Sequence, residues 1–97
     1  MANYLLKLFV TGKTTRSEKA IVNLKRICEN ELAGQFELQI IDVLESPEQA
    51  EEEKILATPT LIKNLPPPIR RIIGDLSDKE KILQALDVSE KNETKGG

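Results

Sequence analysis

The spacing of apolar residues along the chain predicts four strands. Residues 4–10 form a nearly continuous apolar run, typical of a strand buried on both faces and interrupted only by Lys7. Apolar residues alternate from Phe36 and then run on to Val43, which predicts a second buried strand over 36–43. Shorter apolar runs at 60–63 and 69–73 predict a third and a fourth strand.

Helical spacing predicts the first helix between the first two strands. Thr15 and Glu18 have the spacing of a capping box, in which each side chain satisfies a free N–H group at a helix start. Apolar residues then repeat every three or four positions as far as Leu32. Gly34 suits the position that follows a helix end, so the helix is expected to stop just before it.

Two further helices are predicted by their start signals. Ser46 is followed by a proline and then by Gln49, which predicts a helix running to about Leu56. Ser77 and Glu80 have capping-box spacing and predict a third helix at about 78–87.

The predicted order of elements is βαβαββα. Its first half is a parallel βαβ unit with a helical crossover, and its second half is a hairpin covered by a helix. This order is the thioredoxin-like arrangement of the α/β class. We expect a single domain over residues 1–88 and a flexible tail over 89–97, where charged residues mix with glycine.

Composition narrows the possible partners. The 97 residues carry a net charge of −2 and only 3% aromatic residues, so neither a basic field nor a stacking platform for nucleic acid is expected. No apolar run reaches the roughly 18 residues that a membrane span requires. Residues 1–4 lack the basic region of a signal peptide, and we expect a cytoplasmic protein.

The chain lacks the residues of thioredoxin chemistry. A thiol oxidoreductase of this fold has its nucleophilic cysteine at the start of the first helix, but residues 12–17 contain none. The single cysteine, Cys28, lies on the apolar stripe of the predicted helix and is expected to be a core residue. With no histidine either, we expect no catalytic residues, cofactor or metal. A degenerate redox activity through Cys28 is the alternative.

Thr58-Pro59 lies just before the predicted third strand, where thioredoxin-like domains carry a cis-proline. An ordinary turn with a trans bond and a cis bond are equal alternatives here, because most X–Pro bonds are trans but the order of elements matches the thioredoxin-like cis site. A cis bond would expose Thr58 and the neighbouring backbone for docking.

Prolines and paired arginines mark the predicted hairpin. Pro66 to Pro68 are either a stiff spacer or a polyproline surface for a partner. Arg70 and Arg71 point to opposite faces of a strand, either as solvated edge charges or as anchors for carboxylates. Lys7 and Asp42 interrupt apolar strands and are expected to form pairs or to emerge at strand ends. Glu51 to Glu53 are expected to form a solvated helix face.

Three stretches of the sequence, 40–44, 50–61 and 65–76, closely resemble KaiB, a family of circadian clock components. The strings LATPTL and LPPPxRRIIGDLS are long and specific, and the likeness runs from about Tyr4 to Asp87. The resemblance implies a non-enzymatic regulator that binds the N-terminal ATPase ring of a KaiC hexamer. It also implies that the complex sequesters KaiA and displaces the kinase SasA, whose N-terminal domain is itself thioredoxin-like.

The resemblance further implies fold switching between a tetrameric resting form of order βαββααβ and a monomeric thioredoxin-like form. Positions of this chain that match basic contact residues of the family are Lys7, Lys19, Lys54, Arg70 and Arg71. We also expect Asp42 and Pro67 to contact a partner. Thr58, Pro59 and Ala85 are the expected fold-switch positions. The family often has lysine where this chain has Gln39, which suggests a paralogue acting in stress or metabolic regulation.

The segment after Glu80 is rich in good helix formers and contains no glycine before Asp87. We therefore expect this chain to favour the monomeric thioredoxin-like form, with a homotetramer as the alternative. A free-standing sensor domain like that of SasA is a further alternative function.

Overall fold

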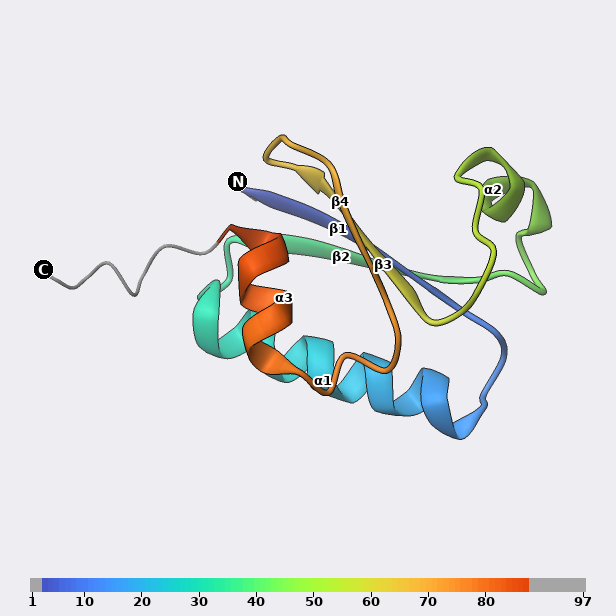
Figure 1. Cartoon of the computed structure of the whole chain (residues 1–97), viewed down its shortest axis with the longest axis horizontal. Helices are drawn as coiled ribbons and strands as arrows, with labels where there is room; N and C mark the ends of the chain where they lie inside the picture. The colour runs from blue at the N-terminus through green and yellow to red at the C-terminus, as the bar shows by residue number, and fades with distance from the viewer. Residues whose placement is uncertain (1–2, 88–97) are drawn as a thin grey trace, which may run out of the picture.

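The computed structural model describes residues 3–87, which form a four-stranded sheet and three helices (Figure 1). The elements in chain order are β1 (Tyr4–Val10), α1 (Thr15–Glu31), β2 (Phe36–Asp42), α2 (Pro47–Glu52), β3 (Thr60–Leu65), β4 (Arg70–Ile73) and α3 (Lys79–Leu86). The predicted order βαβαββα is confirmed. The tail predicted at 89–97 lies outside the described residues.

The strands lie in the order β2-β1-β3-β4. β1 and β2 are parallel and are joined by α1, whereas β3 is antiparallel to both β1 and β4. The hairpin of β3 and β4 turns at Pro66–Pro68, as predicted, and its bonds Leu65–Pro66 and Pro67–Pro68 are cis, as is Thr58–Pro59. None of the helices within residues 3–87 has the length and apolar character needed to cross a membrane.

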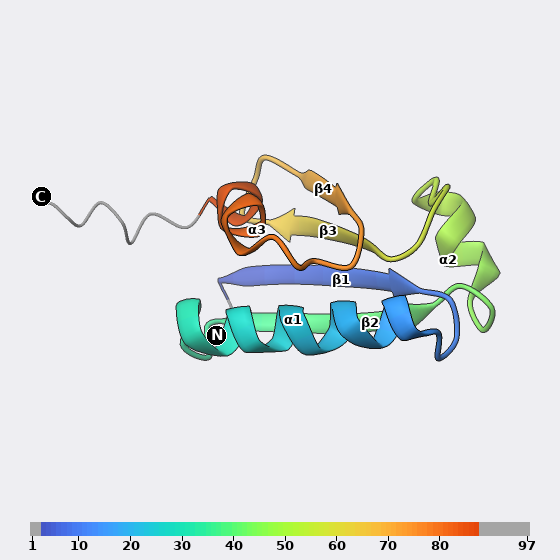
Figure 2. The ribbon, with the colours of Figure 1, turned by 60° about the horizontal axis from the view of Figure 1, so that its bottom comes forward.

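Helices α1 and α3 cover one face of the sheet, which we call the helical face (Figure 2). The alternation of side chains along each strand sends every second residue into this layer. Cys28 is fully buried here, as predicted. The buried apolar side chains of this core are Leu6, Leu8, Val10, Ala20, Leu24, Ile27, Cys28, Leu32, Leu61, Leu76, Ile82, Leu83 and Leu86.

The opposite face of the sheet, which we call the open face, has a much smaller core. Phe9, Ile41 and Ile62 are buried there, with Val43 and Ile55 packed against them. Helix α2 lies beyond one end of the sheet and has no buried residue (Figure 1). Most of the open face therefore stays uncovered.

Two predicted helix caps were wrong by one residue. The side chain of Thr14, not Thr15, caps α1 by accepting a hydrogen bond from the Ser17 amide. Asp78, not Ser77, caps α3 by accepting one from the Lys81 amide. In both places two short polar residues are adjacent, and the residue with extended backbone becomes the cap.

Two element predictions were also wrong in part. β2, predicted as a buried strand, is an edge strand in which only Ile41 is buried. α2 ends at Glu52, four residues before Leu56, because Lys54 has left-handed backbone (φ 56°). The chain then turns toward β3 and leaves Leu56 in solvent.

A candidate protein-docking surface

A row of side chains crosses the open face. The strand registers place Gln39 beside Lys7, Lys7 beside Ile62, and Ile62 beside Arg71. Neighbouring strands are about 4.8 Å apart, so the bases of Lys7 and Arg71 stand about 10 Å apart. The Glu53 carboxylate bridges them, 3.7 Å from Lys7 Nζ and 3.9 Å from Arg71 Nη2.

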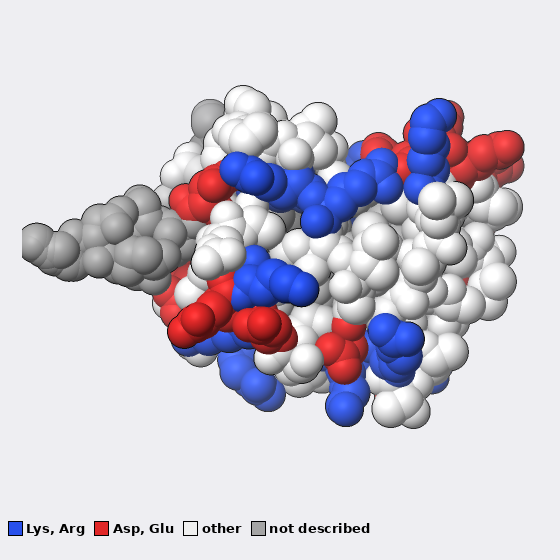
Figure 3. Space-filling view, viewed as in Figure 1, with Lys and Arg blue, Asp and Glu red and all other residues white. Residues whose placement is uncertain are grey.

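Arg71 attaches the end of α2 to the sheet. Its guanidinium donates hydrogen bonds to the backbone carbonyls of Glu53 and Lys54, the latter at 3.5 Å. α2 itself buries no side chain, so these contacts add to the packing of Ile55 in holding its C-terminal end to the sheet. Figure 3 shows a line of basic side chains over the region of β4 that ends beside the acidic residues near α2.

Apolar side chains are exposed at the same end of the sheet. Leu56 is 95% exposed and Leu44 is 68% exposed. Leu56 lines a hollow of about 190 Å³ between α2 and the segment that leads to the Thr58–Pro59 bond, and Val43, the neighbour of Leu44 in the chain, lines it too. The hydroxyl of Thr58 is hydrogen-bonded to that of Thr11, which ties this segment to the loop after β1.

Asp42 supports this end of the sheet from within. Its Oδ1 accepts hydrogen bonds from the amides of Gly12, at 3.1 Å, and Leu44, at 2.9 Å. The carboxylate is half-buried and joins the loops after β1 and β2. Its position suits it to ordering these loops more than to contacting a partner.

The other predicted contact residues lie elsewhere. Lys19 is exposed on α1, and Pro67 is exposed at the turn of the β3–β4 hairpin. Arg70 points to the helical face, opposite to Arg71 as predicted, and its Nη2 lies 3.6 Å from Asp87. The structure therefore brings together Lys7, Lys54 and Arg71 around Glu53. Thr58 lines the hollow beside Leu56, and Lys19, Pro67 and Arg70 lie apart from both.

Sequence reasoning missed two charged residues that organise the molecule. Glu53, predicted to be part of a solvated face, is the carboxylate that joins Lys7 to Arg71. Lys63 is only 1% exposed, and its Nζ lies 2.7 Å from Asp87 Oδ2. The sequence feature that could have revealed this pair is a lysine at the end of the apolar run 60–63, since a lysine in a buried strand needs an acidic partner.

The Lys63–Asp87 pair joins β3 to the end of α3. The hydrogen bond from Lys63 holds the pKa of Asp87 below its ordinary value, and Arg70 acts in the same direction. Asp87 also forms the left-handed cap of α3 (φ 58°), so one residue ends the helix and neutralises the buried lysine.

Nothing among the described residues resembles a redox or metal centre. Burial, with a smaller effect of Glu29, raises the pKa of Cys28 to about 12, so its thiol stays protonated near neutral pH. Across residues 3–87, no three His, Cys, Asp or Glu side chains are grouped so that they could hold a metal ion.

The sheet order and the two helices on one face of the sheet define a thioredoxin-like domain. The N-terminal domain of SasA from Synechococcus elongatus superposes with a TM-score of 0.73 at 28% identity, covering 90% of this chain and 86% of that one. Mitochondrial thioredoxin 3 of Saccharomyces cerevisiae superposes with a TM-score of 0.72 at 18% identity, covering 90% and 79% of the two chains.

The sequence comparisons identify the family. Residues 7–88 match the KaiB domain. The circadian clock protein KaiB3 of a Synechocystis species is 56% identical over 91% of this chain and 86% of its own length. A circadian clock oscillator protein KaiB of Prochlorococcus marinus is 61% identical over 88% of this chain and 79% of its own length. The chain belongs to the KaiB family.

Proposed function

We propose that this chain is a non-enzymatic, cytoplasmic regulator that binds the N-terminal ATPase ring of a KaiC-type hexamer. The observation that carries the proposal is the exposure of Leu56 and Leu44 at the end of the sheet where Lys7 and Arg71 pair with Glu53. An apolar centre with a polar rim is the usual anatomy of a protein interface. Through this surface the chain modulates circadian or stress-linked phosphorylation signalling.

The likeness to the SasA domain supports competition for one site on the hexamer. The two domains share a fold at 28% identity. In this proposal they use the same end of the sheet to bind a partner. In this proposal the chain displaces a SasA-like kinase, and its complex with the hexamer sequesters KaiA.

Fold switching is part of the proposal, because the second half of the chain is weakly packed. Five large apolar side chains between residues 44 and 73 are at least half exposed, and α2 buries none of its residues. These side chains gain burial if residues 47–87 repack or meet a partner. The five are Leu44, Leu56, Leu65, Ile69 and Ile73.

Binding is tested by mixing the full chain with a cyanobacterial KaiC hexamer and ATP overnight and measuring co-elution on sizing. We expect a complex, and we expect Leu56→Asp to weaken it at least about 30-fold, as for a hot-spot residue. Because Leu56 is 95% exposed, this change should leave folding intact.

Val22→Asp is the matched control, because Val22 is also exposed, at 53%, but lies on α1. It should bind like the wild type. If no complex forms while a Prochlorococcus KaiB binds under the same conditions, the proposed function is wrong. An equal loss of hexamer binding in the Leu56 and Val22 variants would show that the proposed surface is not the binding site.

Ala85→Gly is expected to shift the chain away from the thioredoxin-like form. Glycine in a helix interior costs about 1 kcal/mol relative to alanine. In the proposal, α3 belongs to the thioredoxin-like form and not to the alternative form. Backbone NMR shifts of residues 79–86 report on the helix. The ratio of the helical form to any alternative form should fall about fivefold. An unchanged helix signal with no second set of peaks would contradict the fold-switch proposal.

No feature of the described residues favours the redox alternative. Cys28 is fully buried with a raised pKa, which is the opposite of a reactive thiol.

A further inference from the structure

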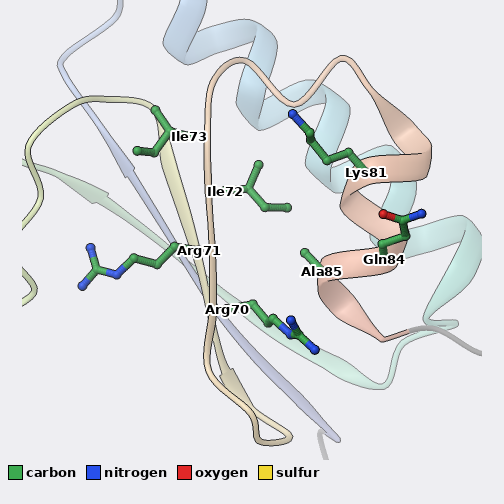
Figure 4. Close-up of a pocket in the computed structure, with 7 residues that line it drawn as sticks. All are labelled: Arg70, Arg71, Ile72, Ile73, Lys81, Gln84 and Ala85. Carbon is green, nitrogen blue, oxygen red and sulfur yellow. The ribbon is translucent and has the colours of Figure 1, made fainter.

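A groove runs between α3 and β4, on the helical side of the sheet edge (Figure 4). It has a volume of about 350 Å³. Ile72 of β4 and Ala85 of α3 point into it from opposite sides and form an apolar floor. Arg70 lies at one end, and Lys81 reaches toward the other.

The groove lies along a free sheet edge. β4 is the last strand in the order, so the N–H and C=O groups of every second residue in Arg70–Ile73 point away from β3. An exposed edge next to an apolar groove is the geometry that accepts an extended peptide as an added strand. Backbone hydrogen bonds supply part of the affinity, and alternate side chains enter the groove.

The charges around the groove select its occupant. The Arg70 side chain is 49% exposed and lies 3.6 Å from the Asp87 carboxylate. Lys63 lies closer to the same carboxylate, at 2.7 Å. Lys81 is exposed and has no ion pair with any residue in 3–87. A second copy of this chain paired along β4 would bring its own arginines against these cations, so an acidic segment fits and a second copy does not.

We propose that this groove binds an extended acidic segment of a partner protein, which adds a strand to the edge of β4. An apolar side chain of the segment packs on Ile72 and Ala85, and flanking carboxylates pair with Arg70 and Lys81. Arg71 and Ile73 point to the other side of the strand (Figure 4). Arg71 borders the groove as well, but its side chain contacts Glu53 of the docking surface, so the two sites use opposite sides of β4. The groove proposal does not depend on KaiC binding.

The test is an NMR titration of the full chain with a capped peptide in which a valine has a glutamate two positions away on each side and threonines between them, because residues two apart on a strand share one face. We expect shift changes and slower amide exchange at 70–73, with smaller changes at 81–85. The matched peptide with lysine in place of glutamate should bind at least about tenfold more weakly, because it meets like charges.

Variants separate this site from non-specific attraction. Lys81→Glu should weaken binding of the acidic peptide at least about tenfold, and Arg70→Gln by a smaller factor. Lys79→Glu is the control, because Lys79 lies on the same helix but pairs with Glu31 of α1 at 3.2 Å. Thermal melts followed by circular dichroism establish that each variant is folded.

Four results would overturn the proposal. They are the absence of binding, equal binding of the two peptides, shift changes confined to residues 53–58, and equal losses in the Lys81 and Lys79 variants. Protection of 70–73 that grows with protein concentration without peptide would identify a second copy as the occupant instead.

Discussion

Lys63→Ala is expected to lower the free energy of unfolding by about 3 kcal/mol, because removing a long buried side chain leaves a cavity. Only 1% of the lysine is exposed, whereas Asp87 is 39% exposed. Once Lys63 is removed, Asp87 can regain water, so most of the loss comes from the missing side-chain volume rather than from the ion pair. Urea unfolding followed by circular dichroism measures the change.

Lys63→Met is the matched control, because it keeps the volume of the stem and removes the charge. Replacing a buried charge by an apolar side chain of similar size is often neutral or stabilising, so we expect a change within about 1 kcal/mol of the wild type. Equal destabilisation by alanine and methionine would mean that the charge, not the packing, matters at this position.

The same pair predicts a dependence on pH. The pKa of Asp87 is lowered from 3.8 in the folded protein, first by the hydrogen bond from Lys63. A lowered folded pKa contributes stability that is present above the unfolded pKa and is lost as the pH falls through the folded value. Wild type should therefore lose stability below about pH 4, and Lys63→Met should lose less of it. Identical acid profiles for the two proteins would contradict this role of the pair.

Arg71→Glu is expected to release the end of α2 and to weaken binding of a KaiC-type hexamer at least about 30-fold. The substitution removes both hydrogen bonds to the carbonyls of Glu53 and Lys54 and sets a carboxylate against the Glu53 side chain. The turn after α2 is closed by the amide of Ile55, which donates to Ala50 O at 2.9 Å. Exchange of this amide should become at least about tenfold faster.

Arg71→Lys separates charge from geometry. Lysine keeps the attraction to Glu53 but lacks the planar fork that reaches two acceptors, so its effects should be intermediate. Global stability should change by less than about 1 kcal/mol in both variants, because Arg71 is 42% exposed at its side chain. Fast Ile55 exchange with unchanged binding would show that α2 is not part of the docking surface.

Much of the fold was predictable from local sequence. The bounds of β1 and the order βαβαββα followed from apolar spacing, because a side chain's face is set by its position along a strand or helix. The opposite directions of Arg70 and Arg71 followed from the same rule. The start of α2 at Pro47 was predicted correctly. The starts of α1 and α3 were predicted only to within one residue, because two adjacent residues in each place can form the cap.

The candidate site was less predictable. Lys7 and Arg71 were singled out separately, but their shared partner Glu53 was assigned to a solvated face. The link requires a register that sets β1, β3 and β4 side by side, and no local spacing specifies that register. The same holds for Lys63 and Asp87, which are 24 residues apart in the chain.

The sequence by itself determined the element order, the absence of a cysteine pair, the core position of Cys28 and the family. Only the tertiary structure decided that β2 is an edge, that α2 ends at Glu52, and that a groove opens between α3 and β4. These features depend on which strands become neighbours and on backbone contacts such as those of Arg71. Contacts between distant residues form only once the sheet has assembled, so periodicity and capping signals could not reveal them.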